Sequence, residues 1–148
     1  MVRFKIEYFV PSWTTDETEN HARLDFCLIG EPFTQNGWKV KWRGLPIPII
    51  YDPRSREKTA LRRALKRAMV EANVPGTTFF PPAIRLSVRI YYFQDGAHDK
   101  DLDNMTKFLG DAMEGAIYPD DKMIWHCVTE KEESIEPRTV VSVERQVF

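Results

Sequence analysis

The stretch from Asp101 to Asp121 constrains the fold most, because it sets one short amphipathic helix between two groups of acids. The charged face of this helix carries Asp103, Lys107 and Asp111 at i, i+4 and i+8, one above another. Its buried face is predicted by apolar residues at helical spacing near 102–116, namely Leu102, Met105, Leu109, Ala112, Met113 and Ala116. Such a helix must pack its apolar face on another element and leave its charged face in solvent.

The rest of the chain predicts an α+β fold, with a mixed sheet of about four to five strands and two main amphipathic helices packed on it. The first helix is expected to begin at Asp52-Pro53, an N-cap candidate followed by proline, and to run to residue 72. Residues 31–50 are expected to form a long loop. Strands are predicted at 23–29, 84–93, 123–130 and 139–147. Residues 1–21 are expected to be an N-terminal extension, irregular except for a short edge strand at 3–10, before one domain at 22–148.

Composition excludes several classes of protein. No apolar run approaches the roughly 20 residues that cross a bilayer, and the N-terminus does not resemble a secretory signal. The three histidines lack ligand spacing and the two cysteines are not paired in sequence, which argues against zinc. The net charge is −1, but the first half of the chain is basic and the second half is acidic.

The acids around the second helix have both structural and chemical explanations. Asp101 could cap the helix, Asp103 could pair with Lys107, and Asp120-Asp121 could form a turn. Together, however, these carboxylates would repel one another without a cation, and hard oxygen ligands are what Mg²⁺ prefers. We therefore predict a Mg²⁺ site, with Mn²⁺ as the alternative ion. Asn104 and Asp111 are expected to brace the ligands rather than bind the ion.

Basic residues in the first half predict contact with nucleic acid. Seven Lys or Arg residues and one acid lie between Arg54 and Arg67, whereas ordinary solvated helix faces mix both signs. The loop before this helix alternates rings and cations, and its tryptophans are predicted either to pack in the core or to stack on bases. The expected DNA-binding residues are Asn36, Lys39, Lys41, Arg43, Arg62, Arg63, Lys66 and Arg67.

The motif from 101 to 121 resembles that of the RusA-like Holliday-junction resolvases. The shared pattern is Asp101-x-Asp103-Asn104-x-x-Lys107-x-x-x-Asp111-Ala112, followed by Asp120-Asp121 before a strand. The loop Pro32-Phe33-Thr34-Gln35-Asn36-x-Trp38 is similar to the proline-plus-asparagine loop of that family.

The resemblance implies a Mg²⁺-dependent homodimer, bacterial or phage-encoded and cytoplasmic. It would nick four-way DNA junctions symmetrically during recombination and repair. The three metal-binding aspartates of the family match Asp101, Asp103 and Asp121, and Asp120 could replace Asp121. Lys107 matches the lysine that cleavage requires.

Two other functions fit the same residues. One is a non-catalytic DNA-binding dimer, in which the acids only cap helices and keep the protein soluble. The other is a different metal-dependent phosphodiesterase or nuclease, acting on branched or single-stranded DNA or on a nucleotide. The junction-nuclease interpretation requires that acids before and after the second helix meet around one divalent ion.

Overall fold

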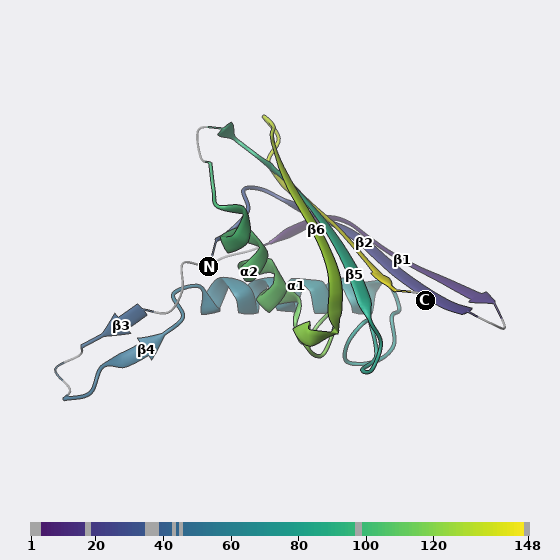
Figure 1. Ribbon diagram of the computed structural model, residues 1–148, viewed down its shortest axis with the longest axis horizontal. Helices are drawn as coiled ribbons and strands as arrows, with labels where there is room; N and C mark the ends of the chain where they lie inside the picture. The colour runs from purple at the N-terminus through teal and green to yellow at the C-terminus, as the bar shows by residue number, and fades with distance from the viewer. Residues whose placement is uncertain are drawn as a thin grey trace.

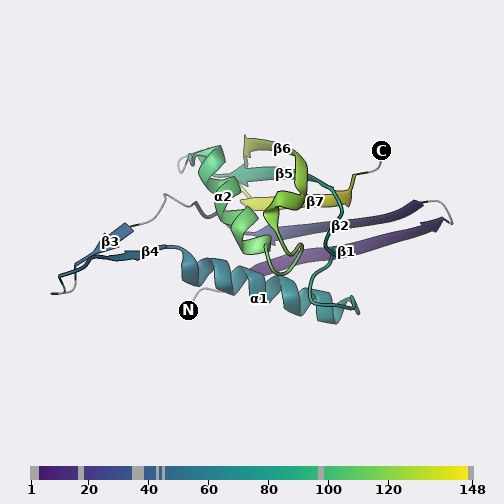
Figure 2. The same cartoon turned by 60° about the horizontal axis from the view of Figure 1, so that its bottom comes forward.

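A computed structural model describes residues 4–16, 19–34, 39–42, 44, 46–96 and 99–146. The described chain forms a five-stranded mixed sheet in the order β1-β2-β7-β5-β6, with two helices, as the sequence predicts (Figure 1). Both helices pack on the face of the sheet that buries alternate residues of β5, such as Val88 and Ile90 (Figure 2). The bounds of the five strands are Lys5–Asp16 (β1), Glu19–Ile29 (β2), Leu86–Gln94 (β5), Ile124–Glu133 (β6) and Arg138–Arg145 (β7).

The connection between β5 and β6 decides where the acids lie. These two strands are parallel, with Leu86 opposite Ile124 and Gln94 opposite Glu133, whereas the other pairs in the sheet are antiparallel. A parallel pair needs a crossover that returns the chain along the whole strand. Helix α2 (Leu102–Met113) is that crossover, so its N-terminus lies toward the end of β5 and its C-terminus toward the start of β6.

The N-terminal segment differs from the expectation of an irregular extension. Strand β1 has 12 residues and pairs with β2 from Lys5 to Asp16, so it forms one edge of the main sheet. The predicted edge strand at 3–10 is therefore too short. Pro11 is tolerated because an edge strand leaves every second backbone N–H facing solvent, where proline's missing donor is not needed.

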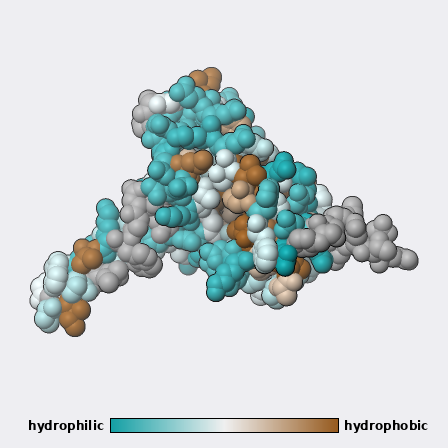
Figure 3. Space-filling model, in the orientation of Figure 1, coloured by the Kyte–Doolittle hydropathy of each residue, from teal (hydrophilic) through white to brown (hydrophobic). Residues whose placement is uncertain are grey.

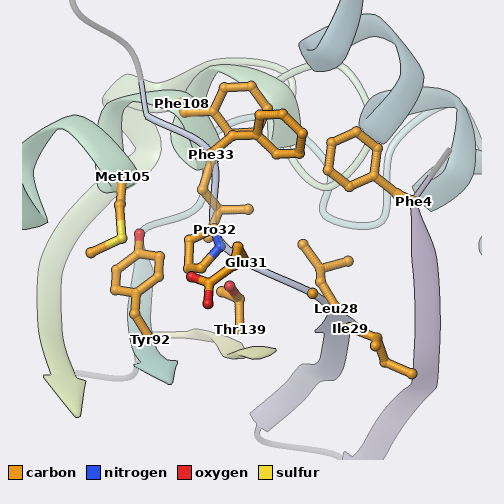
Figure 4. A pocket seen from close by; sticks show the side chains of 12 residues that line it. Phe4, Leu28, Ile29, Glu31, Pro32, Phe33, Tyr92, Met105, Phe108 and Thr139 are labelled. Atoms are coloured by element: carbon orange, nitrogen blue, oxygen red, sulfur yellow. The ribbon is translucent and has the colours of Figure 1, made fainter. Parts of the chain in front are cut away.

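Helix α1 (Ser55–Glu71) buries Leu61, Leu65 and Met69 as predicted. Helix α2 buries most of its predicted face, and also Phe108. The ring of Phe108 stacks on Phe33, with centroids 5.3 Å apart, at an apolar cavity of about 310 Å³ between α2 and the sheet (Figure 4). Among the described helices, none combines the length and apolar character needed to cross a membrane.

The predicted long loop at 31–50 contains a second, two-stranded sheet. Strand β3 (Lys39–Lys41) pairs antiparallel with β4 (Ile49–Tyr51), and among the described strands neither pairs with the main sheet. This hairpin projects away from the domain beside the start of α1, at the left of Figures 1 and 2. The expectation of a loop is therefore wrong for 39–41 and 49–50, which lie in strands.

Candidate metal and nucleic-acid site

The N-terminal end of α2 carries the first predicted group of acids. Asp101 is the N-cap, and its Oδ1 accepts a hydrogen bond from the Asn104 backbone N–H at 3.2 Å. Asp103 follows in the first turn and Lys107 lies one turn later, both exposed. The helix dipole stabilises negative charge at this end. Capping therefore accounts for one oxygen of Asp101, whereas the carboxylate of Asp103 faces solvent beside it.

A hydrogen-bond network fixes the loop that leads into this end of α2. The buried side chain of Gln94 donates to Asp99 at 2.9 Å and accepts from the Lys100 backbone N–H at 3.3 Å. Lys131 Nζ donates to Asp99 at 2.8 Å and to the Lys100 carbonyl at 3.1 Å. The hydrogen bonds from Lys131 and Gln94 lower the pKa of Asp99. Residues of β5 and β6 thus hold the backbone immediately before Asp101.

The C-terminal end of α2 carries a second group of acids. One carboxylate oxygen each of Asp111, Glu114 and Asp121 lies within 4.8 Å of the other two. Asp120 is turned differently, because its Oδ1 caps the short 3-10 helix (Asp121–Met123) by accepting from the Lys122 backbone N–H at 2.9 Å. Of the two neighbouring aspartates, Asp121 is therefore the better placed to contribute to a cluster of oxygen ligands.

Two cations from α1 stabilise this acidic end of the helix. The buried Lys58 (6% exposed) bonds Asp111 at 2.9 Å and Asp52 at 2.7 Å. Arg62 donates to the carbonyls of Asp111 and Glu114 at 2.8 and 2.7 Å, which satisfies helix-end groups that lack intrahelical partners. Arg62 was predicted to contact DNA, but in this structure its guanidinium caps α2.

Tyr118 forms a further contact with the same end of α2. Its hydroxyl donates to the Gly110 carbonyl at 2.8 Å. Burial raises the pKa of this phenol, and the nearby negative charges of Asp121 and Glu114 raise it further.

The three carboxylates of Asp111, Glu114 and Asp121, with Lys58 bonded to one of them, still carry an excess of negative charge. Hard oxygen donors of this kind suit a divalent ion such as Mg²⁺.

Replacing Lys58 with alanine is expected to lower the free energy of unfolding by about 3 kcal/mol, because the carboxylate of Asp52, whose side chain is only 11% exposed, then loses its ammonium partner. Burial alone would raise the pKa of Asp52, but hydrogen bonds from Lys58 and the Arg54 backbone lower it below its ordinary value. This stabilisation is therefore present above about pH 4 and is lost as the pH falls through the lowered pKa.

Urea denaturation at pH 7 and pH 3 measures the effect. The control is Lys66→Ala, an exposed residue of the same helix, for which we expect a change within about 0.5 kcal/mol. Equal stability of Lys58→Ala and the wild type at pH 7 would contradict the structural role of the ion pair.

The two acidic groups do not meet within one protomer. Helix α2 has 12 residues and is therefore about 18 Å long. Asp103 and Asp111 are eight positions apart, about 12 Å along the axis, and Asp121 lies beside Asp111. Two oxygens bound to one Mg²⁺ must lie within about 4 Å of each other. In one chain, therefore, Asp121 is not brought to the same ion as Asp101 and Asp103.

The predicted nucleic-acid residues fall on two surfaces. Arg63, Lys66 and Arg67 are exposed along α1. Lys39 and Lys41 are exposed on β3, and the Lys41 ammonium lies 4.4 Å above the centre of the Tyr51 ring. Asn36 and Arg43, the remaining predicted DNA contacts, lie outside the described residues, as does Trp38.

The family of the chain follows from its sequence. The family model described as endodeoxyribonuclease RusA matches residues 30–144, which include α1, α2 and both acidic groups. The chain belongs to the RusA endodeoxyribonuclease family. Among curated proteins, none matches the sequence. The match begins directly after β2, so in this RusA-family protein the whole β1–β2 hairpin precedes the matched region.

Two residues of this RusA-family site were not found from the sequence. Glu114 extends the Asp103, Lys107, Asp111 face by three positions, which is the helical spacing that places it on the same face. Lys58 lies three residues before Leu61, on the apolar stripe of α1, and a lysine at such a position indicates a buried ion pair. Both signals were present, but the sequence analysis only counted Lys58 among the basic residues between Arg54 and Arg67.

Proposed function

We propose that this RusA-family endodeoxyribonuclease resolves four-way DNA junctions by paired, symmetric nicks that depend on Mg²⁺, in recombination and repair. We propose further that it acts as a homodimer in the cytoplasm and is bacterial or phage-encoded. The family match carries this proposal, since it covers the aspartate–lysine helix. The acids at the two ends of α2 and the basic residues of α1 and β3 support it.

The length of α2 supports a metal site shared between two protomers. Asp103 and Glu114 lie on one face, eleven positions and therefore about 16 Å apart. If two α2 helices pack antiparallel about a two-fold axis, Asp103 of one protomer meets Glu114 and Asp121 of its partner. Each dimer then holds two equivalent sites, as two symmetric nicks require. Asp101 and Asp103 of each site come from one protomer and Asp121 comes from the other.

The residues of this site divide the chemistry between them. Asp101, Asp103 and Asp121 provide the hard oxygen ligands, with Asp120 as the alternative to Asp121, and Asn104 and Asp111 orient them. When bound, Mg²⁺ (or Mn²⁺) supplies Lewis-acid catalysis. Lys107, one turn from Asp103, stabilises the negative charge that develops on the phosphate or on the leaving 3′ oxygen.

The basic surfaces hold the arms of the DNA in this proposal. Arg63, Lys66 and Arg67 on α1 contact phosphates, as do Lys39 and Lys41 on β3. Asn36 and Arg43 are proposed to act with them. Arg62 contributes by holding the end of α2, where its guanidinium is already bonded.

Incubation with a labelled four-way junction and with linear duplex of the same length tests the function. We expect paired nicks in the junction with Mg²⁺, none with EDTA, and little cutting of the duplex. Junction binding without Mg²⁺-dependent cutting would favour a non-catalytic DNA-binding dimer. Cutting of single-stranded DNA or nucleotides in preference to junctions would favour another phosphodiesterase. A steep fall in affinity with salt is expected for binding through many phosphates.

A further inference from the structure

The β3–β4 hairpin exposes apolar and aromatic side chains that the fold does not use. Val40, Trp42 and Ile47 are 54%, 68% and 72% exposed. Figure 3 shows hydrophobic surface on this hairpin, where it projects from the domain at the lower left. A projecting element that carries large apolar side chains into solvent is characteristic of an interaction surface.

The charge of the hairpin indicates an anionic partner. Residues 32–51 include three cations and no Asp or Glu, in a chain whose net charge is −1. Because successive side chains of a strand point to opposite faces, Lys39 and Lys41 share one face of β3 and Val40 lies on the other. The hairpin therefore combines a cationic face with apolar groups, which is the combination that binds nucleic acid through phosphates and base stacking together.

Ion pairs and a hydrogen bond attach the base of the hairpin to helices α1 and α2. Asp52 directly follows β4, and its ion pair with Lys58 continues to Asp111 on α2. On the other side, Arg54 Nε donates to the Thr34 carbonyl at 3.1 Å, and its guanidinium lies 5.3 Å from the centre of the Phe33 ring. These contacts fix the base of the hairpin relative to the acids at the C-terminal end of α2.

We propose that the β3–β4 hairpin contacts the branch point of the DNA, where Trp42 stacks on an exposed base while Lys39 and Lys41 bind the flanking phosphates. The inference rests on the proposed junction-nuclease function, because a branch point offers bases that are not stacked on both sides. Tryptophan has the largest ring among the side chains, and stacking on it does not depend on base identity.

Substitutions that separate ring stacking from general apolar contact test the proposal. Trp42→Leu is expected to weaken junction binding roughly 5- to 150-fold, whereas Trp42→Phe retains a ring and loses only a few-fold. A junction carrying 2-aminopurine at the branch point reports stacking directly. We expect wild type and Trp42→Phe to change its fluorescence on binding in EDTA, and Trp42→Leu to change it much less.

Trp125→Leu is the matched control. This tryptophan is also largely exposed, at 61%, but it lies on β6 with the Arg85 guanidinium 3.6 Å from its ring centre. We expect its junction affinity to match the wild type within about two-fold, since it lies on a strand of the main sheet rather than on the hairpin and its ring already contacts the Arg85 guanidinium.

Two outcomes would overturn the proposal and leave the nuclease intact. One is wild-type affinity and 2-aminopurine response in Trp42→Leu, although the wild type cuts junctions. The other is a fall of Trp42→Leu to the mass of one protomer in sedimentation, which would make the hairpin a contact between two copies of the chain. A wild-type protein that neither binds nor cuts junctions would overturn the proposed function and this inference together.

Discussion

Mixing two inactive variants is expected to restore cleavage, if one protomer provides Asp103 and its partner provides Asp121. Asp103→Asn and Asp121→Asn proteins should each be inactive alone. In a mixed dimer one site then carries both substitutions and the other carries neither. Because half of randomly formed dimers are mixed and each has one intact site, about a quarter of the sites should recover.

A supercoiled plasmid with an extruded cruciform separates the possible outcomes. Wild type, with two sites, should linearise it, whereas a mixed dimer should nick one strand and relax it. The matched control is a mixture of Asp101→Asn and Asp103→Asn proteins, which should stay inactive because both residues belong to the same half of the site. A site built from one chain would leave both mixtures inactive, and that result would contradict the shared site.

Local patterns in the sequence predict the helices of this protein well. The period of apolar residues places the buried face of α2 correctly at Met105, Leu109 and Ala112, and it leaves Asp103 and Lys107 in solvent. These predictions hold because side chains one turn apart share a face whatever the tertiary fold is. The motif on this helix is also the part of the chain that indicates the family, and the family match confirms it.

The relation between the two acidic groups could not be predicted in the same way. It depends on β6 pairing parallel to β5, a non-local choice that makes α2 carry the chain along the full strand. Had the two strands been joined by a tight hairpin, Asp101 and Asp121 would lie at one edge of the sheet. Instead, Asp101 and Asp121 are separated by α2, the helix that the period of apolar residues predicts, although they are near each other in the sequence.

Strand β1 and the hairpin β3–β4 were not predicted correctly from the sequence for a different reason. Both contain or adjoin proline and polar residues, which are disfavoured in central strands but tolerated at edges and in exposed hairpins. Strand propensity therefore underestimates the elements that lie outside the core. The same exposure makes β3–β4 available to a ligand, so the element that local patterns describe least well carries one of the proposed contacts with DNA.

Replacing Lys107 with alanine is expected to lower the rate of junction cleavage by about 10²- to 10³-fold while leaving junction affinity within a few-fold. The ammonium is exposed on the face of α2 between Asp103 and Asp111, where it is proposed to stabilise charge that develops only in the transition state. An interaction of that kind changes the rate of the bound complex more than it changes binding. Single-turnover cleavage with protein in excess measures the rate apart from affinity.

Lys66→Ala provides the contrast, because this lysine is exposed on α1 and is proposed to contact a phosphate. We expect weaker binding, a slope of affinity against salt that falls by about 1, and an unchanged cleavage rate once the junction is saturated. Lys107→Ala is therefore expected to lower the cleavage rate and keep the affinity, whereas Lys66→Ala is expected to lower the affinity and keep the rate. If Lys107→Ala instead behaved like Lys66→Ala, losing affinity and keeping the rate, Lys107 would belong to the DNA-binding surface and the proposed chemistry would need another cation.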